Sequence, residues 1–201
     1  CAPQSIKCKV TTVDHGELGN CTWLLLGDAT LFITGTGDLP YVYSSPWSSY
    51  PIKRVVIRPG ITSIGNSMFN SCSALTSVTI PDSVTSIGNW AFEDCTSLTN
   101  VTIPDSVTSI GYGAFKGCTS LTGITIPDGV TSIGTGAFCN ASLTSVKLPA
   151  GGVTLGDSLF RECENLTDVT LPADLTVIGP SMFENCGSLK NVTIPSGVTH
   201  I

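Results

Sequence analysis

The amino-acid sequence predicts a β-rich α/β solenoid, an array of 23-residue coils that follows an N-terminal β-hairpin cap. Residues 78–100 and 101–123 carry nearly the same 23-residue segment twice in succession. An aliphatic residue opens each unit and returns after steps of 23, 23, 23, 22, 23 and 23 residues. A fixed period of this length is typical of solenoids, in which each coil rests on its neighbours. The opening residues, called place 1 below, are Ile52, Leu75, Leu98, Leu121, Leu143, Leu166 and Leu189.

Places 2 to 6 of each unit predict a short β-strand. In residues 76–80, Val78 and Ile80 point to one side and Thr79 to the other, which is the alternation of a half-buried strand. Proline stands at place 7 in six units, and its missing N–H ends the hydrogen-bond ladder there. The stretch that leads to the cysteine at place 21 leaves room for one turn of α-helix or 3₁₀-helix.

Glycine and phenylalanine recur at places 14 and 18. The glycine has two interpretations: a corner that needs positive φ, or a close backbone approach where a Cβ would clash. Six of the seven phenylalanines stand at place 18, which predicts a column of rings along one axis. One coil buries too little apolar surface to offset the ordering of its 23 residues, so contacts between coils must supply the rest.

The N-terminal residues break the period and predict the cap. Two strand-like runs, 22–26 and 30–34, are joined by three residues that favour a turn, so we expect a β-hairpin over the apolar end of the first coil. Trp23 and Trp47 are expected in the core of this cap. The chain therefore divides into a cap and an array, whose ranges are 1–51 and 52–201.

The array contains seven units, of which the last stops at Ile201, before its glycine, phenylalanine and cysteine. Solenoids need a terminal cap that hides the last apolar face. We therefore hypothesise that the native chain continues beyond residue 201.

Composition and charge narrow the class of partner. The 201 residues are 41% hydrophobic and 12% charged, with a formal net charge of −6. Nucleic acid and anionic membranes bind proteins through clustered Lys and Arg. This acidic chain has few of them, so neither partner is expected to bind. The one basic cluster, Lys53, Arg54 and Arg58, is interpreted as a solvated patch. No apolar run approaches the roughly 18 residues of a membrane span.

The pattern L-x-x-V-x-I-P-x-x-V-x-x-I-G-x-x-x-F-x-x-C resembles the BspA-like (Treponema-type) leucine-rich repeats. The resemblance covers residues 52–201, and the segment before them resembles the one that precedes such repeats in surface proteins. It departs from the better-known leucine-rich repeat in lacking an asparagine ladder after the strand. The resemblance implies a leucine-rich repeat array in an extracellular or cell-surface protein, often linked to adhesion.

Five cysteines hold place 21 and predict a thiol ladder, while Cys139 lies two places early in the shortened unit. Coils about 4.8 Å apart do not exclude disulfides. Buried free thiols are the preferred interpretation because each cysteine lies on the apolar face. Zinc is disfavoured because ligand pairs two to four residues apart and a nearby histidine are missing. The ladder is Cys72, Cys95, Cys118, Cys163 and Cys186.

The remaining cysteines belong to the cap. A Cys8–Cys21 disulfide is the preferred pairing and implies an oxidising compartment. Cys1 is either a spare thiol or the lipid-bearing first residue of a mature bacterial lipoprotein.

No constellation for catalysis, metal or cofactor binding is recognised. His15 and His200 are the two histidines, and neither recurs with a nucleophile. Asp82, Asp105 and Asp128 follow the prolines, where aspartate accepts local backbone hydrogen bonds. We therefore expect a protein that is not an enzyme and uses no cofactor.

The outward side chains of the strands, at places 3 and 5, form the candidate partner-binding face. An alternative interpretation gives this threonine-rich face only a structural role. The stretches between glycine and cysteine, with Trp90, Tyr112, Met68, Met182 and Lys116, are a rival contact surface. The candidate face comprises Arg54, Ser77, Thr79, Asn100, Thr102, Thr125, Ser145, Lys147, Asp168, Thr170, Asn191 and Thr193, with Val56 and Gly123 at the two remaining positions.

Two functions remain open. One is a recognition or adhesion module at a cell surface, which binds a protein or a glycan through the solenoid. The alternative is a rigid spacer within a larger surface protein.

Overall fold

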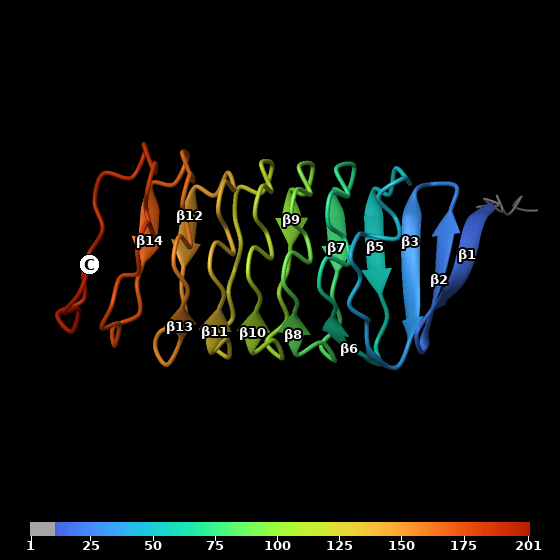
Figure 1. The fold of residues 1–201 in the computed structure, drawn as a ribbon, viewed down its shortest axis with the longest axis horizontal. Coiled ribbons are helices and arrows are strands. Elements are labelled where there is room, and N and C mark those ends of the chain that lie inside the picture. The colour runs from blue at the N-terminus through green and yellow to red at the C-terminus, as the bar shows by residue number, and fades with distance from the viewer. Residues whose placement is uncertain (1–10) are drawn as a thin grey trace, which may run out of the picture.

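The computed structural model describes residues 11–201, which form a β-solenoid of stacked coils (Figure 1). One sheet runs along the array in the order β1-β2-β3-β5-β7-β9. Further along the same side, two more strands, β12 and β14, pair in parallel. These strands are β1 (Thr12–Leu18), β2 (Cys21–Leu26), β3 (Thr30–Gly35), β5 (Arg54–Ile57), β7 (Ser77–Thr79), β9 (Asn100–Val101), β12 (Ser145–Lys147) and β14 (Asp168–Thr170).

A second parallel sheet forms another side of each coil, in the order β13-β11-β10-β8-β6-β4. The repeat pattern gives no sign of this second sheet. Most of its strands are a Ser–Ile, Thr–Leu or Gly–Asp pair, too short to show alternation, and the isoleucines Ile87, Ile110 and Ile133 are each 1% exposed. The strands are β4 (Gly37–Asp38), β6 (Ile61–Ile64), β8 (Ser86–Ile87), β10 (Ser109–Ile110), β11 (Ser132–Ile133) and β13 (Thr154–Leu155).

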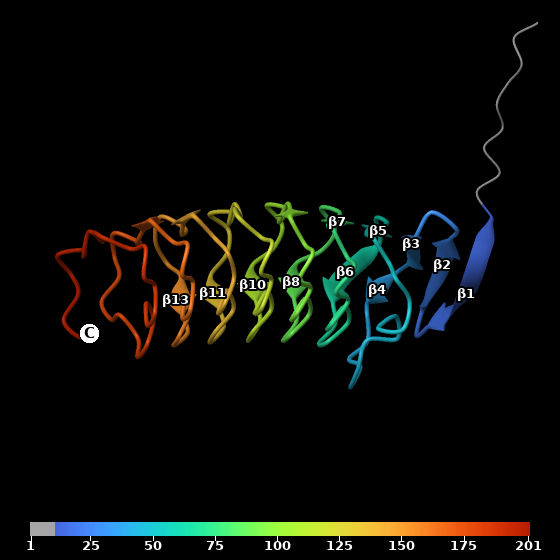
Figure 2. The same ribbon diagram turned by 90° about the horizontal axis from the view of Figure 1, so that it is seen from above.

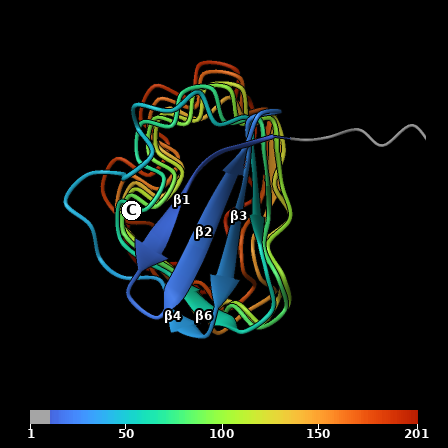
Figure 3. The same cartoon turned by 90° about the vertical axis from the view of Figure 1, so that its right-hand side faces the viewer.

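The cap contains the predicted hairpin and one strand more. β2 and β3 pair antiparallel, which confirms the hairpin, and β1 adds a third antiparallel strand at the edge. β3 then pairs in parallel with β5, so the cap and the coils share one continuous sheet. Figure 3 shows β1, β2 and β3 lying across the end of the array, where they cover the core. The segment between β4 and β5 projects beyond the outline of the coils (Figure 2).

The core is a column of stacked rings, as predicted. Successive phenylalanine rings from Phe69 to Phe183 lie 5.2 to 5.9 Å apart between centroids, with interplanar angles of 5 to 12°. Trp47 extends the column into the cap, 5.2 Å from Phe69, and is fully buried. Trp23 is half-buried and meets Trp47 edge-on at 6.3 Å.

The place-14 glycines allow a close approach of neighbouring backbones, the second of the two interpretations. None of the six has a positive φ. A Cβ on Gly134 would lie 2.5 Å from the backbone nitrogen of Tyr112 and 2.6 Å from the carbonyl carbon of Gly111. Since real Cβ atoms do not approach backbone so closely, any side chain here would push the two coils apart.

The α/β part of the predicted fold class is wrong, because no helix occurs in residues 11–201. The stretch between glycine and cysteine forms turns instead. Its backbone has positive φ at places 16 and 20 of the first six coils, as at Trp90 (53°) and Asp94 (56°). Left-handed residues at these two places interrupt any right-handed helix.

Removing one ring of the column should destabilise the whole array. Phe115→Ala is expected to lower the free energy of unfolding by about 3–5 kcal/mol, because Phe115 is fully buried between Phe92 and Phe138. Urea denaturation measures the change. The control is Tyr112→Ala, a half-exposed ring that should cost less than about 1 kcal/mol. Equal losses in the two variants would contradict a packed column.

Candidate binding surface

The predicted face runs along the outside of the first sheet and continues over β12 and β14. Ser77 and Val56 are half-buried, and every other residue proposed for it is exposed. Between them, Val78, Val101 and Val146 point inward and are 3 to 7% exposed. The parallel registers place equivalent side chains side by side, as in the row Arg54, Ser77, Asn100.

A polar hollow of about 320 Å³ interrupts this face in its middle. It forms at Gly123, where the missing side chain leaves a gap and the strand pairing is reduced to isolated bridges from Gly123 to Ser145 and from Thr102 to Thr125. A Cβ added at Gly123 would meet no atom within 4 Å. The lining residues are Asn100, Val101, Thr102, Gly123, Ile124, Thr125 and Ser145.

The face carries little unpaired charge at its N-terminal end. Arg54 is held by Asp28 at 2.6 Å and by the hydroxyl of Thr30 at 2.9 Å. The hydrogen bond with Thr30, and then the Arg54 guanidinium, lower the pKa of Asp28. Lys147 and Asp168 carry the charges at the other end, on β12 and β14. Asn191 and Thr193 lie beyond β14, outside any strand, and Thr193 lines a second hollow of about 410 Å³.

Threonines at the edges of the strands hold neighbouring coils together. The Thr108 hydroxyl donates to the carbonyl of Thr85 at 3.2 Å, and the Thr108 backbone N–H donates to the same carbonyl at 2.8 Å. The same arrangement recurs at Thr85, Thr131, Thr99 and Thr167. These hydroxyls stand at places 2 and 11, so they leave the outward side chains at places 3 and 5 available to a partner.

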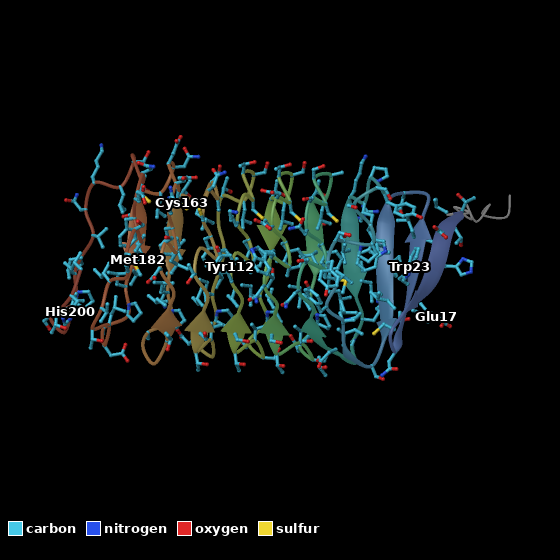
Figure 4. The ribbon with its side chains drawn as sticks, viewed as in Figure 1. Glu17, Trp23, Tyr112, Cys163, Met182 and His200 are labelled. Carbon is cyan, nitrogen blue, oxygen red and sulfur yellow. The ribbon has the colours of Figure 1, made fainter. Side chains whose placement is uncertain are left out.

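The thiol ladder is buried, and its sulfur atoms recur along the array, with Cys163 among them (Figure 4). Each Sγ of Cys95, Cys118, Cys163 and Cys186 donates to the carbonyl of a phenylalanine in the preceding coil, at 3.1 to 3.2 Å. Cys72, the first of the ladder, lies 3.4 Å from the hydroxyl of Ser45 in the cap. None of the five is joined in a disulfide within the described part of the chain.

Burial raises the pKa of these thiols. The pKa of Cys118 and of Cys163 rises to about 12 through loss of solvent, and that of Cys95 is also well above its ordinary value. A thiol with such a pKa stays protonated at neutral pH, so it donates its hydrogen bond and is a poor nucleophile.

The rival surface between glycine and cysteine keeps only part of its predicted residues. Met68 and Met182 are buried in the core. Trp90 and Tyr112 form an edge-on pair with ring centroids 5.1 Å apart, and Tyr112 is labelled in Figure 4. Lys116 is engaged by Glu93 at 2.9 Å.

Groups suited to catalysis or metal binding are not brought together in residues 11–201. His15 lies on β1 and His200 at the other end of the array, and both are exposed. Within that same range no three His, Cys, Asp or Glu side chains are placed to hold a metal ion, and no helix is long and apolar enough to cross a membrane. The predicted Cys8–Cys21 disulfide and the role of Cys1 depend on residues outside the described range, while Cys21 itself is buried at the start of β2.

Comparison with known proteins gives one family and several similar structures. Residues 40–149 and 91–201 match the model described as BspA type leucine rich repeat region, with six copies. The chain is similar to a leucine-rich repeat protein from Bacteroides ovatus, at 29% identity and a TM-score of 0.72, over 94% of this chain and 46% of that one. It is also similar to the leucine-rich repeat protein of T. pallidum, at 28% identity and a TM-score of 0.69, over 88% and 80%. No curated protein matches the sequence. The chain thus spans about half the length of the Bacteroides ovatus protein.

The buried thiols should make the array sensitive to alkali. The unfolded chain loses its thiol protons above pH 8.5 or so, whereas folded Cys118 and Cys163 keep theirs up to about 12. The free energy of unfolding should therefore be unaffected by these thiols below that range and fall as the pH rises through it, by at most about 1.4 kcal/mol per pH unit for each thiol.

Urea denaturation between pH 8 and pH 11 measures this slope. The variant with Cys118→Ala and Cys163→Ala should show a shallower decline, whatever its stability at neutral pH. An unchanged slope would mean that the two thiols ionise equally well in the folded and unfolded chain.

Proposed function

Because the chain belongs to the BspA-type leucine-rich repeat family, we propose that it is a non-enzymatic recognition module at a cell surface. In this proposal a protein or glycan partner binds the outer face of the first sheet, around the hollow at Gly123. A leucine-rich repeat solenoid is typical of protein-interaction or surface modules, which supports the class of function.

The observation that carries the proposal is the polar hollow on an otherwise regular face. Asn100 supplies an amide that donates and accepts, and Thr102, Thr125 and Ser145 supply hydroxyls. Such uncharged groups suit the hydroxyls of a sugar or the backbone of an extended peptide. The alternating inward valines hold these side chains on a rigid support, so that little conformational entropy is lost on binding.

The alternative function, a rigid spacer, is favoured by the unbroken column of rings. Six stacked contacts from Trp47 to Phe183 join the cap and the first six coils, each to the next. Substitution of the outward side chains should not affect the function of a spacer. The double variant Thr102→Ala with Thr125→Ala, which changes two adjacent coils, should therefore weaken a binder and leave a spacer unchanged.

Filling the hollow should weaken binding without unfolding the chain. Gly123→Arg adds a long side chain where nothing lies within 4 Å of the new Cβ and where φ is not positive, so the coil tolerates it. Affinity for a partner that binds around the hollow, found on a panel of glycans and secreted proteins, should fall at least about tenfold, which is about 1.4 kcal/mol.

Gly187→Arg is the matched control. Gly187 also has an open Cβ position without positive φ, but it lies at place 22, away from the sheet face. The control should bind like the wild type. Retained binding by Gly123→Arg, or equal losses in both variants, would contradict a site at this hollow.

A further inference from the structure

The outer face of the cap continues the candidate face with a row of apolar side chains. Leu24 lies opposite Phe32, and Phe32 opposite Val56, in the registers of β2, β3 and β5. Leu24 is 37% exposed, and Phe32 and Val56 are half-buried. The next position in the row is Thr79, where the face becomes polar. The apolar row is thus confined to the N-terminal end of the sheet.

A hollow of about 450 Å³ lies beside this row, at the end of the array where Figure 4 labels Trp23. The guanidinium carbon of Arg58 lies 5.1 Å from the centroid of the Phe32 ring, a cation–π contact. The hydroxyls of Thr22 and Thr34 are hydrogen-bonded to each other at 2.8 Å on the rim. The hollow is lined by Thr22, Trp23, Leu24, Phe32, Thr34 and Arg58.

Arg58 offers an unpaired positive charge. Its neighbour Arg54 is paired with Asp28, but none of the four ion pairs within residues 11–201 includes Arg58. Six later coils have proline at the equivalent place, so the coil itself does not need an arginine there. A guanidinium without a carboxylate partner of its own favours a carboxylate on the bound protein.

We propose that this cap patch, defined as Leu24, Phe32, Val56 and Arg58, docks a segment of a partner protein that carries an apolar side chain beside a carboxylate. The inference rests on the recognition function proposed above and names the partner more closely. The apolar side chain packs on Phe32 between Leu24 and Val56, and the carboxylate bonds Arg58. Aromatic and arginine side chains of this kind supply much of the binding energy at protein interfaces.

A protein segment fits the patch better than a glycan does. The floor consists of aliphatic and aromatic carbon, and Arg58 already lies over the ring of Phe32. The two rim hydroxyls are bonded to each other, which leaves few groups for the hydroxyls of a sugar. The charge of Arg58 then selects among peptides for acidic ones.

Selection of a displayed random-peptide library on the whole chain tests the proposal. The enriched peptides should carry an apolar residue next to Asp or Glu. Phe32→Thr and Arg58→Met should each weaken their binding about tenfold or more. Arg58→Met should also remove the preference for a peptide with Asp over the same peptide with Asn.

Controls separate this patch from the polar hollow. Gly123→Arg should leave peptide binding unchanged, so loss of the proposed function at the hollow would not alter this result. Circular dichroism checks the fold of each variant, and exposed Arg58 provides the test if Phe32→Thr does not fold. The proposal is overturned if no peptide is enriched, if the enriched peptides lack acidic residues, or if Arg58→Met binds them as tightly as the wild type.

Discussion

Every feature of this molecule depends on the close contact of one coil with the next. Parallel backbone hydrogen bonds at two sides of each coil fix the separation, and the phenylalanine rings fill the space between. Glycine at place 14 is needed because the backbones meet there with no room for a Cβ. The sequence repeats because every coil must have the same shape as its neighbours. The residue types at the inward places are therefore nearly constant, whereas those at the outward places vary.

Polar side chains contribute to the same stacking. Threonine hydroxyls at the strand edges and cysteine thiols in the core both donate to carbonyls of the preceding coil. In a chain with only 12% charged residues, these hydroxyls and thiols add to the few ion pairs between coils, such as that of Lys116 with Glu93. The places left for recognition are few: the outward strand positions and the face of the cap.

The coils could be predicted because their sequence repeats. The cap does not repeat, so its apolar patch around Phe32 could not be predicted. The strand at 76–80, the ring column and the glycine contact could all be inferred because seven copies show the same pattern. The second sheet could not, because its two-residue strands show no alternation. The absence of helix was also hidden, since left-handed residues such as Trp90 and Glu162 give no sign of their φ. The patch around Phe32 gives no signal in the repeat pattern, because only the parallel pairing of β3 with β5 makes the cap strands part of the same sheet.

Burial of the thiols makes their oxidation depend on opening of the array. As long as the coils stay stacked, Cys95 and its neighbours are shielded from oxidants by the rings and backbone around them. When a stretch of coils opens, thiols 23 residues apart, such as Cys72, Cys95 and Cys118, become accessible together and are then open to oxidation. The rate of such oxidation in air depends on how large a fraction of the molecules is open, and reducing agents slow the loss without changing any native contact.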